Sequence, residues 1–230
     1  MVSIYNRNTG YWLPRFTLIA LETIVLCLSG WLLLFKGTET LNELLYWSLP
    51  SGNQERNILL FILIVLVYLR MFATIFIFLR RAMPWVEVFT IPLAFSLYYV
   101  GFPLLSLPTN RALDGWDLLF IAIFVVGSFL NTVSEWLRAH WKRKPENRGQ
   151  VYTGGLFRYS AHINYFGDLL WVLALALLTW NPWSFVIPIF LFCFFAFYNI
   201  PMLDRHLENK YGEEFRAYQN KTKKFIPFLY

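Results

Sequence analysis

The stretch Gly155-Leu156-Phe157-Arg158-Tyr159-Ser160-Ala161-His162-Ile163-Asn164-Tyr165-Phe166-Gly167-Asp168-Leu169 leads into apolar residues that continue as far as Trp180. It places Arg158, His162, Asn164 and Asp168 at the mouth of an apolar segment of membrane length. Ionisable and hydrogen-bonding side chains are costly at that depth, so those found there are usually functional. The stretch therefore predicts a membrane helix with a functional site at its polar end.

The composition extends this interpretation to the whole chain. Of the 230 residues 57% are hydrophobic and 15% are charged, whereas soluble domains carry about 25% charged residues. A polytopic membrane protein is the natural interpretation. The net charge of +6 comes from basic residues between apolar runs, which favours anionic lipid headgroups or a phosphate-bearing ligand over nucleic acid. Cys27 and Cys193 lie inside apolar runs, and no metal-ligand spacing occurs.

An all-α bundle of about six transmembrane helices is predicted, because each apolar run is near the roughly 20 residues that cross a bilayer and lipid offers the backbone no partners. The predicted spans are Phe16–Phe35, Ile58–Leu79, Val86–Leu105, Trp116–Leu137, Ile163–Trp180 and Trp183–Ile200. Pro92 and Pro103 predict a bent or broken third span. Beyond the last span, Met202–Tyr211 is expected to extend the helix to Gly212, and Glu213–Lys221 to form a short second helix.

Charge predicts the orientation of the bundle. Basic residues concentrate before the first span, after the second, after the fourth and in the C-terminal tail, so they alternate between the two sides. The positive-inside rule then places both termini in the cytoplasm. Short loops favour a bacterial inner membrane as the location.

Two groups of polar residues could carry chemistry. The loop that contains Lys142, Arg143 and Arg148 either snorkels toward anionic lipid or holds phosphates. In the stretch quoted first, Asn164 can donate and accept hydrogen bonds, and Asp168 follows it by about one helical turn.

Polar residues inside other spans add to this picture. Asn131, Ser134 and Glu135 share one face of the fourth span and could meet the face of Asn164 and Asp168. Glu22 and Arg70 are expected either to form an ion pair between the first two spans or to line a substrate cavity. No nucleotide or hydrolase motif of soluble enzymes occurs, so a nucleotide cofactor would need a non-Rossmann arrangement.

The C-terminal half resembles a known family. The segments that carry the resemblance are Trp141-Lys142-Arg143-Lys144-Pro145-Glu146-Asn147-Arg148-Gly149, Gly155-Leu156-Phe157-Arg158-Tyr159, His162-Ile163-Asn164-Tyr165-Phe166-Gly167-Asp168, Lys210-Tyr211-Gly212 and Ile226-Pro227-Phe228-Leu229-Tyr230. They are similar to the steroid 5-alpha-reductase C-terminal superfamily, and more closely to its bacterial branch DUF1295. Sterol C14-reductases share this layout. The resemblance covers the chain from about Asn131 to its end.

The resemblance implies a single membrane domain over residues 1–230, with substrate-side helices in residues 1–115 and a cofactor-binding half in residues 116–230. The implied activity is NADPH-dependent reduction of a carbon–carbon double bond in a lipophilic substrate that enters from the bilayer, without a metal. The expected catalytic residues are His162, Tyr165 and Asp168, and the expected cofactor-binding residues are Lys142, Arg143, Arg148, Arg158, Asn164, Asp204, His206 and Tyr211. Asn164 and Tyr165 would lie near the nicotinamide, and the basic residues near the phosphates.

The same architecture is shared by isoprenylcysteine and phospholipid methyltransferases, which use S-adenosylmethionine. Their Arg-His-Pro-x-Tyr-x-Gly motif is matched at His162, Tyr165 and Gly167, but Ala161 and Ile163 depart from it. A membrane methyltransferase is therefore the alternative function. A membrane protein that binds lipid or nucleotide without catalysis is a third. The sequence also departs from sterol reductases in the last helix, at Met202 and Leu203, so a sterol substrate is not specified.

Overall fold

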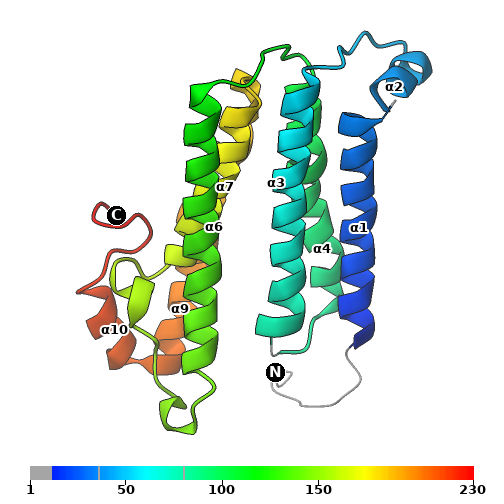
Figure 1. Ribbon diagram of the computed structural model, residues 1–230. Helices are drawn as coiled ribbons and strands as arrows, with labels where there is room; N and C mark the ends of the chain where they lie inside the picture. Colours follow the sequence, from blue (N-terminus) through cyan, green and yellow to red (C-terminus); the bar gives the residue numbers. More distant parts are fainter. Residues whose placement is uncertain (1–11, 36, 80) are drawn as a thin grey trace. The chain divides into compact units, whose positions relative to one another are not determined.

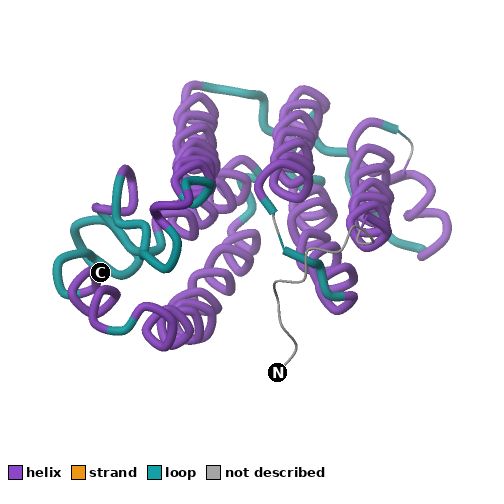
Figure 2. Tube along the Cα trace, turned by 90° about the horizontal axis from the view of Figure 1, so that it is seen from below, coloured by secondary structure: helices purple, strands orange, loops and turns teal. Residues whose placement is uncertain are grey.

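The computed structural model describes residues 12–35, 37–79 and 81–230, and within these ranges it is helical with no strand (Figures 1 and 2). The predicted all-α membrane class is confirmed. The basic segment before the first span, apart from its last residues, and Arg80 lie outside the described residues. The chain forms two compact units, residues 1–117 with 175–184 and residues 118–174 with 185–230.

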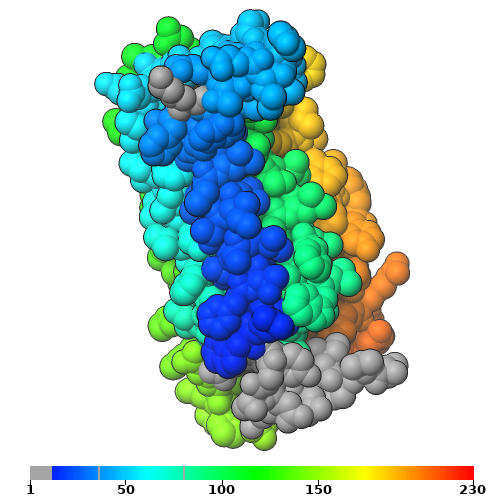
Figure 3. Space-filling model, turned by 90° about the vertical axis from the view of Figure 1, so that its right-hand side faces the viewer, coloured from blue at the N-terminus to red at the C-terminus, as the bar shows by residue number. Residues whose placement is uncertain are grey.

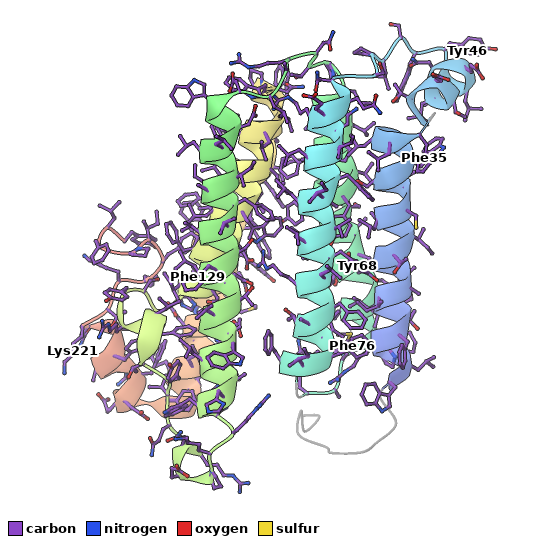
Figure 4. The ribbon with its side chains drawn as sticks, viewed as in Figure 1. Phe35, Tyr46, Tyr68, Phe76, Phe129 and Lys221 are labelled. Atoms are coloured by element: carbon purple, nitrogen blue, oxygen red, sulfur yellow. The ribbon has the colours of Figure 1, made fainter. Side chains whose placement is uncertain are left out.

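The first unit is built around α1, which runs from Trp12 to Leu34. In the space-filling view α3 and α4 flank α1 on its two sides (Figure 3). The remaining bounds in this unit are α2 Gly37–Leu45, α3 Gln54–Ala73 with the π-helical turn η1 Thr74–Phe78, α4 Trp85–Ser96, η2 Leu97–Gly101 and α5 Phe102–Ser106. Tyr46, 95% exposed, projects from the end of α2 (Figure 4).

The two prolines of the third span do not break it. α4, η2 and α5 follow one another without interruption from Trp85 to Ser106, with Pro92 inside α4 and Pro103 at the start of α5. The π-helical turn between them has the wider backbone spacing that accommodates an irregular hydrogen-bond pattern. The third span is therefore not broken, whereas a bend, the other predicted possibility, stays a prediction.

A buried ion pair holds one end of the first unit together. Arg56 is 1% exposed, and its two NH groups lie 2.7 and 3.0 Å from the two carboxylate oxygens of Asp117. The same guanidinium donates to the backbone oxygens of Arg111, Ala112 and Leu178. These bonds use all five N–H donors of an arginine, so the charge is fully compensated.

The second unit contains most of α6, and α7 lies beside α6 (Figure 1). The helices from here to the end of the chain are α6 Gly115–Trp141, η3 Pro145–Asn147, η4 Gly155–Arg158, α7 Ile163–Leu178, η5 Pro182–Phe185, α8 Val186–Phe194, η6 Phe195–Asn199, α9 Ile200–Tyr211 and α10 Glu213–Gln219. The start of α6, the end of α7 and most of η5 belong to the first unit. Gly212, with a φ of 57°, ends α9 as predicted. The predicted second short helix is α10, which ends at Gln219.

In the described part of the chain, five helices are long and apolar enough to cross a membrane: Trp12–Leu34, Gln54–Phe78, Trp85–Ser106, Gly115–Trp141 and Pro182–Tyr211. Each contains one of the predicted spans almost completely. The sixth predicted span corresponds to α7, which is apolar but only 16 residues long. No more than 33% of the apolar window of any of the five is buried by protein, as expected for helices whose outer faces contact lipid.

Candidate functional site

Two glycines bring α6 and α7 into close contact in the second unit. A Cβ atom at Gly127 would lie 2.6 Å from the backbone nitrogen of Trp171, and one at Gly167 would lie 2.5 Å from that of Asn131. Small residues allow helix backbones to approach in membrane proteins. This contact sets the separation at which the polar side chains of the two helices meet.

The polar face of α6 meets the start of α7, as predicted. The side-chain amide of Asn164 donates to Glu135 Oε1 at 2.9 Å, and Asn131 donates to the backbone oxygen of Asn164 at 3.2 Å. Asn164 is only 7% exposed. Buried polar side chains need such partners, so this network fixes the Asn164 amide.

Cations follow the amides along the same face of α6. Arg138 forms an ion pair with Glu135 at 2.5 Å, and Lys142 lies one turn further along. Burial by the surrounding protein is the main cause that lowers the pKa of Lys142 to about 8, although part of the side chain stays exposed, and the positive charges of Arg138 and Lys210 lower it further. The positive charges of Arg138 and Lys210 thus act on Lys142, and the Glu135 carboxylate offsets them in part. An anionic ligand would reduce the remaining repulsion.

His162 is buried and ion-paired. Its Nε2 lies 2.8 Å from Asp204 Oδ1 on α9, and the residue is 2% exposed. Lys224 Nζ lies 3.3 Å from the other oxygen of Asp204. The C-terminal tail also accepts backbone hydrogen bonds from Ala161 and His162 at Lys223 and Lys224. His162 and Asp204, which we predicted separately as catalytic and cofactor-binding residues, therefore form one buried pair that the tail clamps.

Tyr165 is stacked between two rings. Its ring lies 5.7 Å from that of His162 at an interplanar angle of 5°, and 4.6 Å from that of Phe195 at 16°. Asn199 on η6 lies close enough to the Tyr165 hydroxyl to act on it. Because His162 stacks on the Tyr165 ring, the His162–Asp204 pair helps to fix where the Tyr165 phenol lies.

Asp168 lies one turn beyond Asn164 on α7, where its Oδ1 accepts a hydrogen bond of 2.8 Å from the indole of Trp171. Its charge acts on Tyr165. The side chain therefore lies close enough to influence the phenol, while the indole fixes its orientation.

The remaining predicted cofactor residues lie outside this cluster. Arg143 and Arg148 are exposed, and no residue of the described ranges forms an ion pair with either. Arg158 donates to the hydroxyl of Tyr159 at 2.7 Å on the surface. His206 points away from the Asp204 side of α9, and the ring of Tyr211 lies 5.0 Å from Lys210 Nζ.

The loop after α6 is fastened to the C-terminal helices. The backbone nitrogen of Val151 donates to Glu214 at 3.1 Å, and the hydroxyl of Tyr218 donates to the backbone oxygen of Phe157 at 2.6 Å. Burial raises the pKa of Tyr218, so the phenol stays protonated and keeps this donor. The basic loop is therefore a folded element of the second unit.

A second polar cluster lies inside the first unit. Glu22 on α1 and Tyr99 on η2 are both fully buried, and the Tyr99 hydroxyl faces the Glu22 carboxyl. Neither carboxyl oxygen accepts a hydrogen bond from Arg70 or from any other described residue, and the Tyr99 hydroxyl also lacks one. One residue along, Thr23 Oγ1 lies 2.8 Å from the hydroxyl of Tyr68, which Figure 4 labels. Buried polar groups without a hydrogen-bond partner lower the stability of the fold, and such groups are typical of a binding site.

Sequence reasoning missed four contributors to these sites. They are Gly127, Asn199, Lys224 and Tyr99. A small residue in the middle of an apolar span was the available signal for Gly127. The other three come from segments whose spatial neighbours the sequence does not reveal. Among the residues that the structure describes, no three His, Cys, Asp or Glu side chains form a metal-binding group.

Comparison with known proteins gives consistent matches. Residues 80–222, more than half of the chain, match the family described as "Protein of unknown function (DUF1295)". The 3-oxo-5-alpha-steroid 4-dehydrogenase 2 of Homo sapiens is 27% identical over 122 residues, which cover 51% of this chain and 46% of that protein. The 3-oxo-5-alpha-steroid 4-dehydrogenase 1 of Mus musculus is 31% identical over 108 residues, 47% of this chain and 40% of that protein.

A relative of another class also matches. The Protein-S-isoprenylcysteine O-methyltransferase of Saccharomyces cerevisiae is 28% identical over 112 residues, which cover 46% of this chain and 47% of that protein. The matches thus span less than half of the length of each of these relatives.

Proposed function

This chain belongs to the DUF1295 family, and we propose that it is a membrane-embedded reductase that uses NADPH to reduce a carbon–carbon double bond of a lipophilic substrate. Its relatives with known names are enzymes. The observation that carries the proposal is the polar stripe formed by Asn131, Glu135 and Arg138 on α6 and by Lys142 directly after its end. It begins with the Asn131 amide and the Glu135 carboxylate, which meet Asn164, and it ends with the cations Arg138 and Lys142.

The residues present fit NADPH. Asn131 and Lys142 are 11 positions apart in the sequence, which corresponds to about 16 Å along a helix axis. At the Lys142 end of the stripe, the positive charges of Arg138 and Lys210 act on Lys142, and phosphates would neutralise this repulsion. At the Asn131 end, Asn164 gives its amide nitrogen to Glu135, which leaves its side-chain oxygen to accept from the carboxamide of the nicotinamide.

The residues around Tyr165 have separate roles in the proposed reaction. NADPH, when bound, supplies the hydride to one carbon of the double bond. The Tyr165 hydroxyl, held toward Asn199, supplies the proton to the neighbouring carbon. His162 and Phe195 hold the Tyr165 ring between them, and Asp204 and Lys224 hold His162. In this proposal His162 is therefore a positioning residue, and Asp168 adjusts the charge around the phenol.

The cluster around Glu22 has the properties of a substrate contact. A lipophilic substrate with an electron-poor double bond carries at least one polar atom, and that atom needs a hydrogen-bond partner once it leaves the membrane surface. We propose that the Glu22 carboxyl and the Tyr99 hydroxyl provide it. The apolar remainder of the substrate would enter from the bilayer.

A methyltransferase that uses S-adenosylmethionine is the second candidate. The matched yeast methyltransferase supports it, as does the spacing of His162, Tyr165 and Gly167. The cationic end of α6 favours NADPH, because the 2′-phosphate needs several donors and the sulfonium group is itself positive.

Isotope transfer tests the function for a substrate of any identity. The purified protein is incubated with a membrane lipid extract and NADPH carrying deuterium in both positions at C4 of the nicotinamide, and the lipids are analysed by mass spectrometry. We expect a lipid that gains one deuterium and one hydrogen and loses one double bond. A parallel incubation with S-adenosylmethionine bearing a deuterated methyl group detects methyl transfer, and a labelled lipid there alone would overturn the proposal.

The variant Asn164→Ala should abolish deuterium transfer, whereas Asn220→Ala, which changes an exposed asparagine at the end of α10, should not. Equal transfer by the wild type and by Asn164→Ala would remove the site assignment.

A further inference from the structure

We propose that the face of η6 and α9 opposite Asp204 binds the headgroup region of an anionic phospholipid. This face carries an open hollow of about 490 Å³. The described residues that line it are Phe197, Tyr198, Pro201, Met202, Arg205, His206 and Asn209. It faces away from Asp204 and is separate from the cluster around Asn164.

The hollow is apolar at one end and polar at the other. Phe197, Tyr198 and Met202 are 75%, 61% and 54% exposed, and they belong to the part of the helix that continues the apolar span. Arg205 and His206 follow where the helix has left the apolar segment. From Phe197 to His206 the helix rises by about 13 Å, a distance that leads from the acyl chains into the headgroups.

The polar end of the hollow offers the side chains of Arg205 and His206 to a ligand. Neither Arg205 nor His206 forms a hydrogen bond or an ion pair with any residue in the described part of the chain. The nearest carboxylates along the helix are already used: Asp204 is turned inward to His162 and Lys224, and Glu208 accepts from Arg216 at 2.6 Å. An anion therefore meets positive charge here without a competing carboxylate.

The combination identifies a membrane lipid as the occupant. A soluble phosphate would contact only Arg205 and His206 and would leave the aromatic end uncovered. A phospholipid places its phosphate on the Arg205 guanidinium and the His206 ring and its glycerol and first methylenes on Tyr198 and Met202. The membrane face that carries the basic loop after α6 is the one where anionic lipids are most attracted by protein charge.

Lipid retention tests the proposal. The protein is reconstituted in nanodiscs of phosphatidylcholine with phosphatidylglycerol, released in the mass spectrometer, and the lipids that stay bound are counted. We expect the wild type to retain phosphatidylglycerol in preference to phosphatidylcholine. Arg205→Gln should lower this retention about fivefold, the effect of one basic residue near a membrane surface.

The matched control is Lys221→Gln, which removes an exposed cation from the tail (Figure 4) and should leave retention unchanged. Equal losses in both variants, or no loss in Arg205→Gln, would overturn the proposal.

Phe197→Ala should also lower retention of the lipid. Competition by the soluble headgroup glycerophosphoglycerol, at equal potency to the lipid, would show that the site reads a free phosphate ester and would contradict the assignment to a lipid. An unchanged melting temperature of each variant establishes that it is folded.

Discussion

Lys142 combines a positive charge with a lowered pKa, and both properties should appear in cofactor binding. Its pKa of about 8 results mainly from burial, with added repulsion from Arg138 and Lys210. Below pH 8 the ammonium is charged and can bind a phosphate, whereas above pH 8 it loses its proton in the free protein. The 2′-phosphate, whose second pKa is about 6, stays doubly negative throughout.

We therefore predict that the Kd for NADPH rises as the pH increases from 8 to 10, by up to about tenfold per pH unit. Calorimetric titration at several pH values measures this. Lys142→Arg keeps its charge over the whole range, so its Kd should stay flat. A wild-type Kd that is independent of pH over this interval would exclude Lys142 from the phosphate site.

Glu22 presents a conflict between stability and function at a single residue. Its buried carboxyl accepts no hydrogen bond from a described residue, and such a group costs about 1–3 kcal/mol. Glu22→Leu should therefore raise the melting temperature in detergent while it reduces deuterium transfer to the substrate. The melting temperature of Glu22→Gln should fall between those of the wild type and Glu22→Leu. A variant that loses stability and keeps full turnover would contradict a binding role for this side chain.

At the scale of elements, the contact between α6 and α7 determines whether the polar stripe meets Asn164. Gly127→Ala would place a Cβ 2.6 Å from the backbone of Trp171, and overpacking of this kind costs about 1–3 kcal/mol. We predict a lower melting temperature and a loss of NADPH affinity together.

Gly115→Ala provides the control for this substitution. Gly115 opens the same helix, and a Cβ added there meets nothing within 4 Å. This variant should retain both stability and affinity. If the two alanine variants behaved alike, the close approach of the helices would not be what positions the site.

The sequence predicted most of the helices because hydrophobic length and charge specify membrane spans. It also predicted that Asn131 and Glu135 would meet Asn164, since helical periodicity assigns residues to faces. It left open whether Pro92 and Pro103 bend or break the third span, because proline alone does not determine how the neighbouring backbone adjusts, and the helix continues through a π-helical turn between them. It could not pair His162 with Asp204 and Lys224, which lie 42 and 62 residues apart from it and meet only through the tertiary fold.

At the scale of the whole molecule, the charge pattern makes a prediction about orientation. In a background with Cys27→Ala and Cys193→Ala, both of which replace exposed free cysteines, single cysteines are introduced as Lys221→Cys in the tail or Glu43→Cys in α2. A membrane-impermeant maleimide should label the first only from the cytoplasmic side and the second only from the opposite side. Labelling of both from one side would contradict the predicted topology.

The central claim is that the polar stripe of α6, together with α7, holds NADPH. Calorimetric titration of the detergent-solubilised protein with NADPH, NADH and S-adenosylmethionine tests it most directly. We predict that NADPH binds about tenfold or more tightly than NADH, because charge-assisted hydrogen bonds to the 2′-phosphate contribute about 1.5–3 kcal/mol. Lys142→Gln should remove most of this difference. Binding of S-adenosylmethionine without binding of NADPH would contradict the account.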